Sequence, residues 1–199
     1  MAVFFDTAAP FNFSAYQYMV VLNTTGTDVT PSTDTLQTNW AGYSFGLVAL
    51  GNGISSYAEP VYFAHNANPH ISPAWLRLGS TPQTFSYNLN NNGTGTEFSI
   101  LAARSLFNYS PSPAPSSSPS NLWTFNAFVT QAQPGGQWYF LDSMGAGGPI
   151  DPQFVSPVLN MSTCFDNVYY AIYTPSDPSA QIVTIEIANN PASAPCSSS

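Results

Sequence analysis

The sequence predicts an all-β protein, folded as a two-sheet antiparallel β-sandwich with a jelly-roll-like arrangement, about ten short strands and little helix. Three observations predict this class. Apolar and polar residues alternate with a period of two in many segments. Turn-forming residues, among them 18 Pro and 13 Gly, separate these segments at short intervals. No long stretch shows the period of an amphipathic helix. Many short strands of this kind are typical of sandwiches, with a closed β-barrel as the alternative.

The clearest local prediction is a β-hairpin formed by residues 83–90 and 97–102. Both segments alternate strictly between apolar or aromatic residues and small polar residues, which is the pattern of a half-buried strand. The dipeptide Asn92-Gly93 lies between them, and Asn-Gly is a strong signal for a tight hairpin turn. The two segments are therefore expected to pair in antiparallel fashion.

The remaining strands are expected along the whole chain. Their ranges are 14–22, 40–50, 57–65, 74–78, 122–131, 137–142, 167–173 and 181–188, with an N-terminal strand at 2–6. In the segment 122–131 the inward-facing set is predicted to be Trp123, Phe125, Ala127 and Val129. In the segment 181–188 it is predicted to be Val183, Ile185 and Ile187, which leaves Glu186 on the opposite face.

The domain organisation follows from the length of 199 residues, which suits a single domain over 1–199. The segment 110–120, SPSPAPSSSPS, interrupts the strand pattern and has no side chain able to anchor a core. Such a Pro/Ser-rich segment favours an extended path. We interpret it as a surface loop between strands of one domain, and an interdomain linker is the alternative.

The low content of basic residues argues against binding to nucleic acid, and the short apolar runs argue against a membrane span. The chain has two Arg, no Lys and ten Asp or Glu, with a formal net charge of -8. Two cations cannot neutralise a phosphate backbone, so nucleic-acid binding by charge is not expected. No apolar run reaches the ~20 residues of a membrane-spanning helix, so no membrane span is expected. Solubility then depends on Ser, Thr and Asn, as in coats, secreted β-domains and virus shells.

The two cysteines, Cys164 and Cys196, are candidates for a disulfide bond, and two unpaired thiols are the alternative. Two cysteines without nearby histidines do not make a structural zinc site. The two histidines, His65 and His70, would need a third ligand to bind a metal, for which Glu59 is the nearest acid, and their spacing does not match the helical H-E-x-x-H motif. We therefore expect no metal and no cofactor.

Catalytic motifs are missing from the sequence. There is no G-x-S-x-G and no Cys with a His partner by motif. Four acids lie on or beside predicted strands, but no sequence pattern pairs them as a glycosidase requires; they are Glu59, Glu97, Asp142 and Glu186. The sequence therefore predicts a protein that is not an enzyme and names no catalytic residue.

Residues 38–43, TNWAGY, resemble the Asn-Trp-Ala-Gly opening of the fungal glutamic peptidases, which are acid-stable β-sandwich enzymes of similar length. The resemblance covers about five residues and implies a sandwich fold and acid-tolerant hydrolysis. That family uses a catalytic Gln and a catalytic Glu later in the chain. The later segment 122–133, LWTFNAFVTQAQ, has no acid where the Glu should fall, so no catalytic residue is carried over.

Aromatic residues with neighbouring amide or guanidinium groups are candidates for stacking on a sugar ring or contacting a partner. The alternative is that these aromatic side chains belong to the core. The candidates are Trp40, Tyr43, Trp75, Arg77, Gln137, Trp138 and Tyr139.

A surface poor in charge and rich in hydroxyl, amide and aromatic groups is typical of contacts between subunits. The sequence therefore predicts a structural subunit of a virion (an outer, vertex, spike or minor capsid component) or of an extracellular appendage. Its partners are identical or related subunits, contacted through loops that include 110–120 and 145–151. A glycan-binding lectin-like module is the alternative, and a secreted acid-tolerant hydrolase is the third hypothesis.

Overall fold

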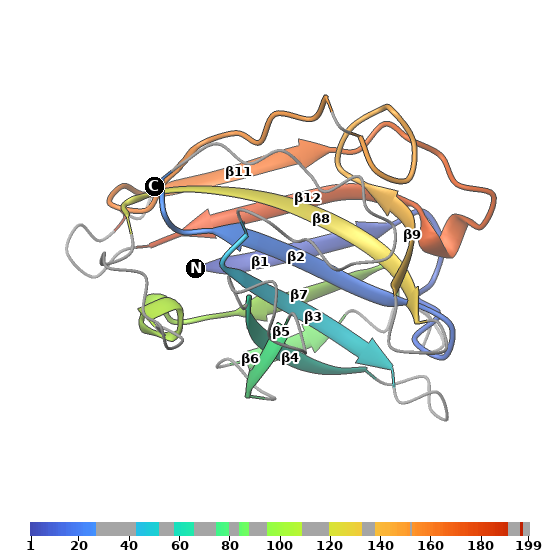
Figure 1. Ribbon diagram of the computed structural model, residues 1–199, viewed down its shortest axis with the longest axis horizontal. Coiled ribbons are helices and arrows are strands. Elements are labelled where there is room, and N and C mark those ends of the chain that lie inside the picture. Colours follow the sequence, from blue (N-terminus) through green and yellow to red (C-terminus); the bar gives the residue numbers. More distant parts are fainter. Residues whose placement is uncertain are drawn as a thin grey trace.

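The computed structural model describes residues 1–26, 43–51, 58–65, 75–79, 84–87, 95–108, 120–132, 138–151, 153–190 and 196. These residues form two antiparallel β-sheets that pack face to face as a sandwich (Figure 1). The predicted all-β, two-sheet antiparallel architecture is confirmed. The helices in the described part of the chain are two short 3-10 turns, η1 (Arg104–Asn108) and η2 (Pro178–Ala180).

The first sheet has five strands in the order β11-β12-β1-β7-β6. Its central strand, β1, pairs with β7 on one side and with β12 on the other. This sheet is therefore assembled from segments that lie far apart in the sequence. The strands are β1 (Ala2–Thr7), β6 (Thr84–Tyr87), β7 (Glu97–Leu101), β11 (Phe165–Tyr170) and β12 (Ile182–Asn189).

The second sheet has seven strands, six of them in the order β10-β8-β2-β3-β4-β5. The seventh, β9, pairs with β8 on the edge that β10 also uses, at the other end of that long strand. Consecutive strands β2 to β5 form a meander. The strands are β2 (Gln17–Asn23), β3 (Phe45–Gly51), β4 (Ala58–His65), β5 (Trp75–Gly79), β8 (Leu122–Ala132), β9 (Trp138–Ser143) and β10 (Leu159–Asn160).

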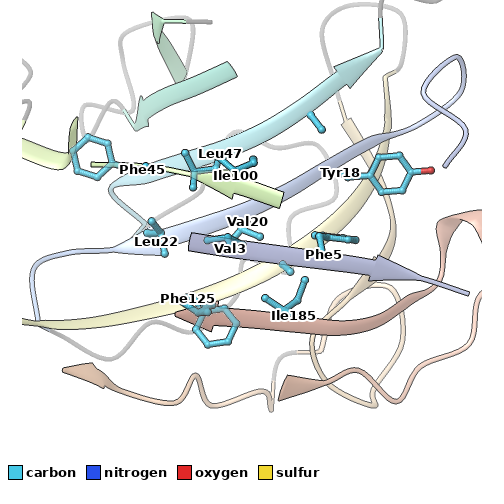
Figure 2. Close-up of a cluster of buried hydrophobic side chains, with 14 of the residues drawn as sticks. Val3, Phe5, Tyr18, Val20, Leu22, Phe45, Leu47, Ile100, Phe125 and Ile185 are labelled. Atoms are coloured by element: carbon cyan, nitrogen blue, oxygen red, sulfur yellow. The ribbon is translucent and has the colours of Figure 1, made fainter. Parts of the chain in front are cut away.

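The main core lies between the two sheets, and Figure 2 shows part of it. Phe5 of β1 stacks on Phe98 of β7 with ring centroids 5.1 Å apart, and it makes a T-shaped contact with Tyr18 of β2 in the opposite sheet. The predicted inward set of β8 is buried as expected. Its members are Trp123, Phe125, Ala127 and Val129.

A second apolar cluster lies on the other face of the seven-stranded sheet. Successive residues of β2 alternate between the two clusters: Tyr18 belongs to the main core and Met19 to the second one. Both are fully buried, so β2 is covered on both faces. The buried members of the second cluster are Met19, Val21, Tyr43, Val48, Trp75, Phe128 and Phe140.

The strand predictions hold with shifted ends, and one face assignment was wrong. Val183 was expected to point into the core, but it is 37 % exposed, whereas Ile182 is fully buried. The register of β12 against β1 shifts between Asp6 and Thr7, and a shift of one residue reverses the face of a side chain. The short strand β10 and both 3-10 turns were not predicted.

Three sequence predictions fall on residues outside those that the structure describes. The Pro/Ser-rich loop at 110–120 is one, since only Ser120 of it is described. The Asn92-Gly93 turn is another, although the two strands that it joins, β6 and β7, do pair in antiparallel fashion. The TNWAGY string is described only from Tyr43 onward.

Candidate functional site: the outer face and edge of the five-stranded sheet

Two of the aromatic residues predicted to contact a glycan lie together in the interior. Tyr43 is 3 % exposed and Trp75 is 8 % exposed, and both belong to the second apolar cluster. Burial raises the pKa of the Tyr43 phenol well above its usual value, and a hydrogen bond with Asn126 opposes this effect. Neither ring presents the exposed face that stacking on a sugar requires. Both are core residues, which was the alternative interpretation of these aromatic side chains.

The other predicted contacts do not converge on one place. Arg77 is exposed on β5, and Tyr139 is exposed on β9. Four strands separate β9 from β5 in the sheet, which corresponds to roughly 24 Å at the usual spacing between strands. The structure describes only the backbone of Trp138, while Trp40 and Gln137 lie outside the described residues.

Four of the ten acids gather on the outer face of the five-stranded sheet. Buried and less buried residues alternate along β1, β7 and β12, and the acids of these strands lie on the face that points away from the core. Directly paired residues share a face, and Asp6 of β1 pairs with Glu97 of β7. Neither Arg lies on this face, because Arg77 is in β5 and Arg104 is in η1. The acids are Asp6, Glu97, Asp166 and Glu186.

The carboxyl groups on this face interact with one another. The pKa of Glu186 is raised above its usual value, first by burial and then by the charge of Asp166 and a hydrogen bond with it, and further by Glu97 and Asp6. Asp6 also accepts a hydrogen bond from the hydroxyl of Thr184 on β12. The outer face thus holds a group of acids in which Glu186 keeps its proton to a higher pH than an ordinary glutamate does.

No group of three or more potential metal ligands occurs among the residues that the structure describes. Asp142, another of the four acids that the sequence analysis placed on or beside strands, lies between the sheets, where it accepts hydrogen bonds from the backbone N–H groups of Ile182 (2.6 Å) and Ser143 (2.8 Å). Its carboxyl group therefore holds the backbone of both sheets. The side chain of Glu59, the remaining acid of that prediction, is not described.

The strand β11 forms one edge of the five-stranded sheet. Ala171, just beyond it, donates its N–H to Val183 of β12, and the pairing continues as Tyr169 with Ile185. Backbone groups alternate in direction along an antiparallel strand, so the odd-numbered residues bond to β12 and the even-numbered ones point outward. Among the described residues, nothing pairs with the backbone of Asp166, Val168 or Tyr170 on that side.

Large apolar side chains on and just after this edge strand are exposed to solvent. Val168 is 46 % exposed and Tyr170 is 71 % exposed, and Ile172 just after the strand is also 71 % exposed. Val168 and Tyr170 share the outer face with Asp166, because they alternate with Asn167 and Tyr169. The same three residues therefore carry both the outward backbone groups and the exposed side chains.

The disulfide bond between Cys164 and Cys196 lies immediately before this edge. The bond joins residue 196 to the residue that precedes β11, and the N–H of Cys196 bonds to the side chain of Asn190 just after β12. The cross-link therefore holds the start of β11 at the end of β12.

The loop 145–151, which was expected to contact neighbouring subunits, is organised from within. The carboxylate of Asp151 accepts hydrogen bonds from the backbone N–H groups of Ala146, Gly147 and Gln153. The carbonyl oxygen of Gly145 accepts from the N–H groups of Ile172 and Tyr173, so the loop closes the edge of the sheet just past β11.

The sequence analysis did not single out β11 as an exposed edge. A usable signal was present: Phe165–Tyr170, FDNVYY, is a strand in which an acid, a valine and a tyrosine share one face. What the sequence does not contain is the position of that strand in the sheet, which depends on contacts between distant segments.

No helix in the described part of the chain has the length and apolar character that crossing a lipid bilayer requires. When the chain is compared with family models, curated proteins and solved structures, no match is found to any of them.

Proposed function

We propose that this chain is a non-enzymatic structural subunit that assembles with identical or related subunits, in the outer part of a virion or in an extracellular appendage. The observation that carries this proposal is the edge strand β11, whose outward backbone groups and exposed Val168 and Tyr170 are available for contact. Soluble monomers usually protect such an edge with Lys, Pro, a bulge or a covering segment.

The charge content supports an assembling role. With two Arg and no Lys, the chain has few of the charged groups that normally oppose association. The same scarcity argues against contact with a packaged genome, since such a layer needs a basic segment. Outer, vertex, spike or minor components of a particle are consistent with this limit.

The disulfide bond supports the location of the protein in an oxidising environment. Disulfide bonds persist in secreted and extracellular proteins and on virion surfaces, whereas the cytosol keeps thiols reduced. The bond between Cys164 and Cys196 fits that pattern. It also fixes the start of β11, the proposed contact strand, to the end of β12.

The placement of the acids supports a structural rather than a catalytic role. Asp142 is engaged by two backbone N–H groups between the sheets. Asp177 accepts hydrogen bonds from the hydroxyl of Tyr16 and from the N–H and hydroxyl of Ser179. Both carboxyl groups hold segments of the chain together.

The test is the oligomeric state of the purified full chain. We expect sedimentation velocity and light scattering to show species larger than the 21.3 kDa monomer, with a fraction that grows with protein concentration. Electron microscopy of the concentrated sample should show regular assemblies. A monomer that persists at millimolar concentration, both at pH 7 and at pH 4, would contradict the proposal.

A further inference from the structure

We propose that two copies of this chain join through their β11 strands, paired in antiparallel fashion about a two-fold axis at Val168. This inference rests on the proposed function, because it names the surface through which the subunits meet. The partner is a second copy, and the two five-stranded sheets become one continuous sheet of ten strands.

The backbone of β11 fits this pairing. Asp166, Val168 and Tyr170 direct their N–H and C=O groups away from β12. With Val168 opposite Val168, Asp166 of one copy lies opposite Tyr170 of the other. Each of these opposed pairs then exchanges two hydrogen bonds, as hydrogen-bonded pairs of antiparallel strands do. All outward backbone groups of the three residues are satisfied.

The side chains of the same residues indicate why the occupant is a second copy. Along the edge they read acceptor, apolar, donor: the Asp166 carboxyl group, Val168 and the Tyr170 hydroxyl. Read in the antiparallel direction, the order becomes donor, apolar, acceptor, so the edge is complementary to itself. Opposed side chains on one face lie about 4.5–5.5 Å apart at their Cβ atoms, within reach of such contacts.

The register also keeps like charges apart. Asp166 is the acid of β11, and in this pairing the Asp166 carboxyl groups of the two copies are offset by four residues. That offset corresponds to roughly 13 Å along the strands. This exceeds the Debye length of about 8 Å at physiological ionic strength, so their repulsion is largely screened. A register in which Val168 of one copy faced Asp166 of the other would halve this offset and bring the two Asp166 carboxyl groups closer together.

The extent of the edge agrees with a pairing of this length. The outward N–H of Ile172 is already bonded to Gly145, so the available edge ends at Tyr170. At the other end the disulfide at Cys164 precedes the strand. Three outward residues, centred on Val168, remain between these two limits.

The sharpest test is cysteine cross-linking of the full chain under mild oxidation. In a hydrogen-bonded antiparallel pair the Cα atoms are about 5.5 Å apart, which lies within the range that a disulfide bond spans. The variant Val168→Cys is therefore expected to form a covalent dimer with itself. The variant Tyr170→Cys is not, since its two copies lie roughly 13 Å apart along the strands, but mixing it with Asp166→Cys should give a mixed dimer. Peptide mapping checks that Cys164 and Cys196 remain joined.

A second measurement uses charge without introducing a thiol. Val168→Glu should shift the association equilibrium at least tenfold toward monomer, because it adds one carboxyl group from each copy at the axis, on a face that already carries acids. Leu76→Glu is the matched control, since Leu76 is 43 % exposed on β5, an edge strand of the other sheet. It should leave association unchanged, and circular dichroism verifies that both variants are folded.

The outcomes separate this inference from the proposed function. If the wild-type chain assembles but Val168→Cys gives no covalent dimer and Val168→Glu assembles normally, the β11 pairing is wrong and the assembly role stands. If Tyr170→Cys cross-links with itself as well as Val168→Cys does, the register is wrong. If the wild-type chain is monomeric under all conditions, both proposals fail.

Discussion

The carboxyl group of Asp142 on β9 accepts a hydrogen bond of 2.6 Å from the backbone N–H of Ile182 on β12, so one side chain links the two sheets of the sandwich. A second hydrogen bond comes from the N–H of Ser143. Asp142 has no exposed surface, and its burial raises the pKa of the carboxyl group from 3.8 to about 7, although the two N–H donors oppose the shift.

The first prediction concerns the pH dependence of stability. The folded chain holds the Asp142 proton up to about pH 7, whereas the unfolded chain releases it near 3.8. Folding therefore takes up a proton between these values, and the free energy of unfolding falls as the pH rises from about 4 to about 7. Three pKa units correspond to roughly 4 kcal/mol. Denaturant titrations at several pH values measure this slope.

The control for this prediction is Asp142→Asn, which has no proton to exchange. Its unfolding free energy should vary much less with pH in that window. Asp142→Ala should cost roughly 2–4 kcal/mol at pH 4, because two N–H donors lose their acceptor. If the wild-type chain is as stable at pH 7 as at pH 4, or if the asparagine variant keeps the slope, the role assigned to Asp142 is wrong.

The second prediction concerns the loop that Asp151 organises. Three backbone N–H groups converge on its carboxylate and keep its pKa below the usual value. Because that pKa is lowered, the stabilisation is present above pH ~4 and is lost as the pH falls below this value. Asp151→Ala should therefore speed amide hydrogen exchange of Ala146 and Gly147 at least tenfold at pH 7. Exchange in β1 serves as the internal reference, and an unchanged loop would refute the assignment.

The sequence predicted the sandwich because alternation is a local property. The face pattern of β8, with Trp123 and Phe125 inward, can be inferred from adjacent residues alone. The face prediction for β12 was wrong at Val183, because the one-residue register shift there depends on pairing with β1, a strand about 180 residues away in the sequence. The burial of β2 on both faces was also not predicted, although the unbroken run YMVVL is typical of a strand covered on both sides.

The candidate contact surface was harder to predict from the sequence than the fold was. Composition indicated an assembling protein, but the residues named for contact were chosen for aromatic character. Tyr43 and Trp75 satisfy that criterion equally well as core residues, which is where the structure places them. Val168 was not named, since a valine in a strand becomes a contact residue only when its strand lies at an edge.

The third prediction concerns the disulfide bond. Cys164 and Cys196 are separated by 32 residues, so reduction frees a loop whose closure is worth roughly 3–4 kcal/mol. The free energy of unfolding of the double variant Cys164→Ser and Cys196→Ser should be lower by that amount, so the variant should unfold at a lower denaturant concentration. Adding reductant to this variant should have no further effect, whereas it should bring the wild-type chain to the same midpoint. An unchanged wild-type midpoint after verified reduction would show that the cross-link contributes little.

The fourth prediction links pH to association through the outer face. Joining two β11 edges places the carboxyl groups of Asp6, Glu97, Asp166 and Glu186 of both copies on one continuous sheet face, with no Arg of either copy on it. The pKa of Glu186 is raised above 4.5 by burial and by its acidic neighbours, so this carboxyl group is largely protonated at pH 4 and gains its charge at a higher pH than an ordinary glutamate does. Association should therefore be tighter at pH 4, and it should weaken as the pH rises past the usual range of a glutamate.

Two neutral variants grade this effect by distance from the edge. Glu186 lies on β12, next to β11, and Glu97 lies on β7, three strands from β11. At an ionic strength of about 0.01 M, where the Debye length is about 30 Å, Glu186→Gln should strengthen association at pH 7 by up to about fivefold, or ~1 kcal/mol, and it should have no effect at pH 4. Glu97→Gln should have a smaller effect than Glu186→Gln at pH 7, because the interaction between two charges weakens as the distance between them grows. Equal effects of the two variants in sedimentation equilibrium would place the contact away from β11.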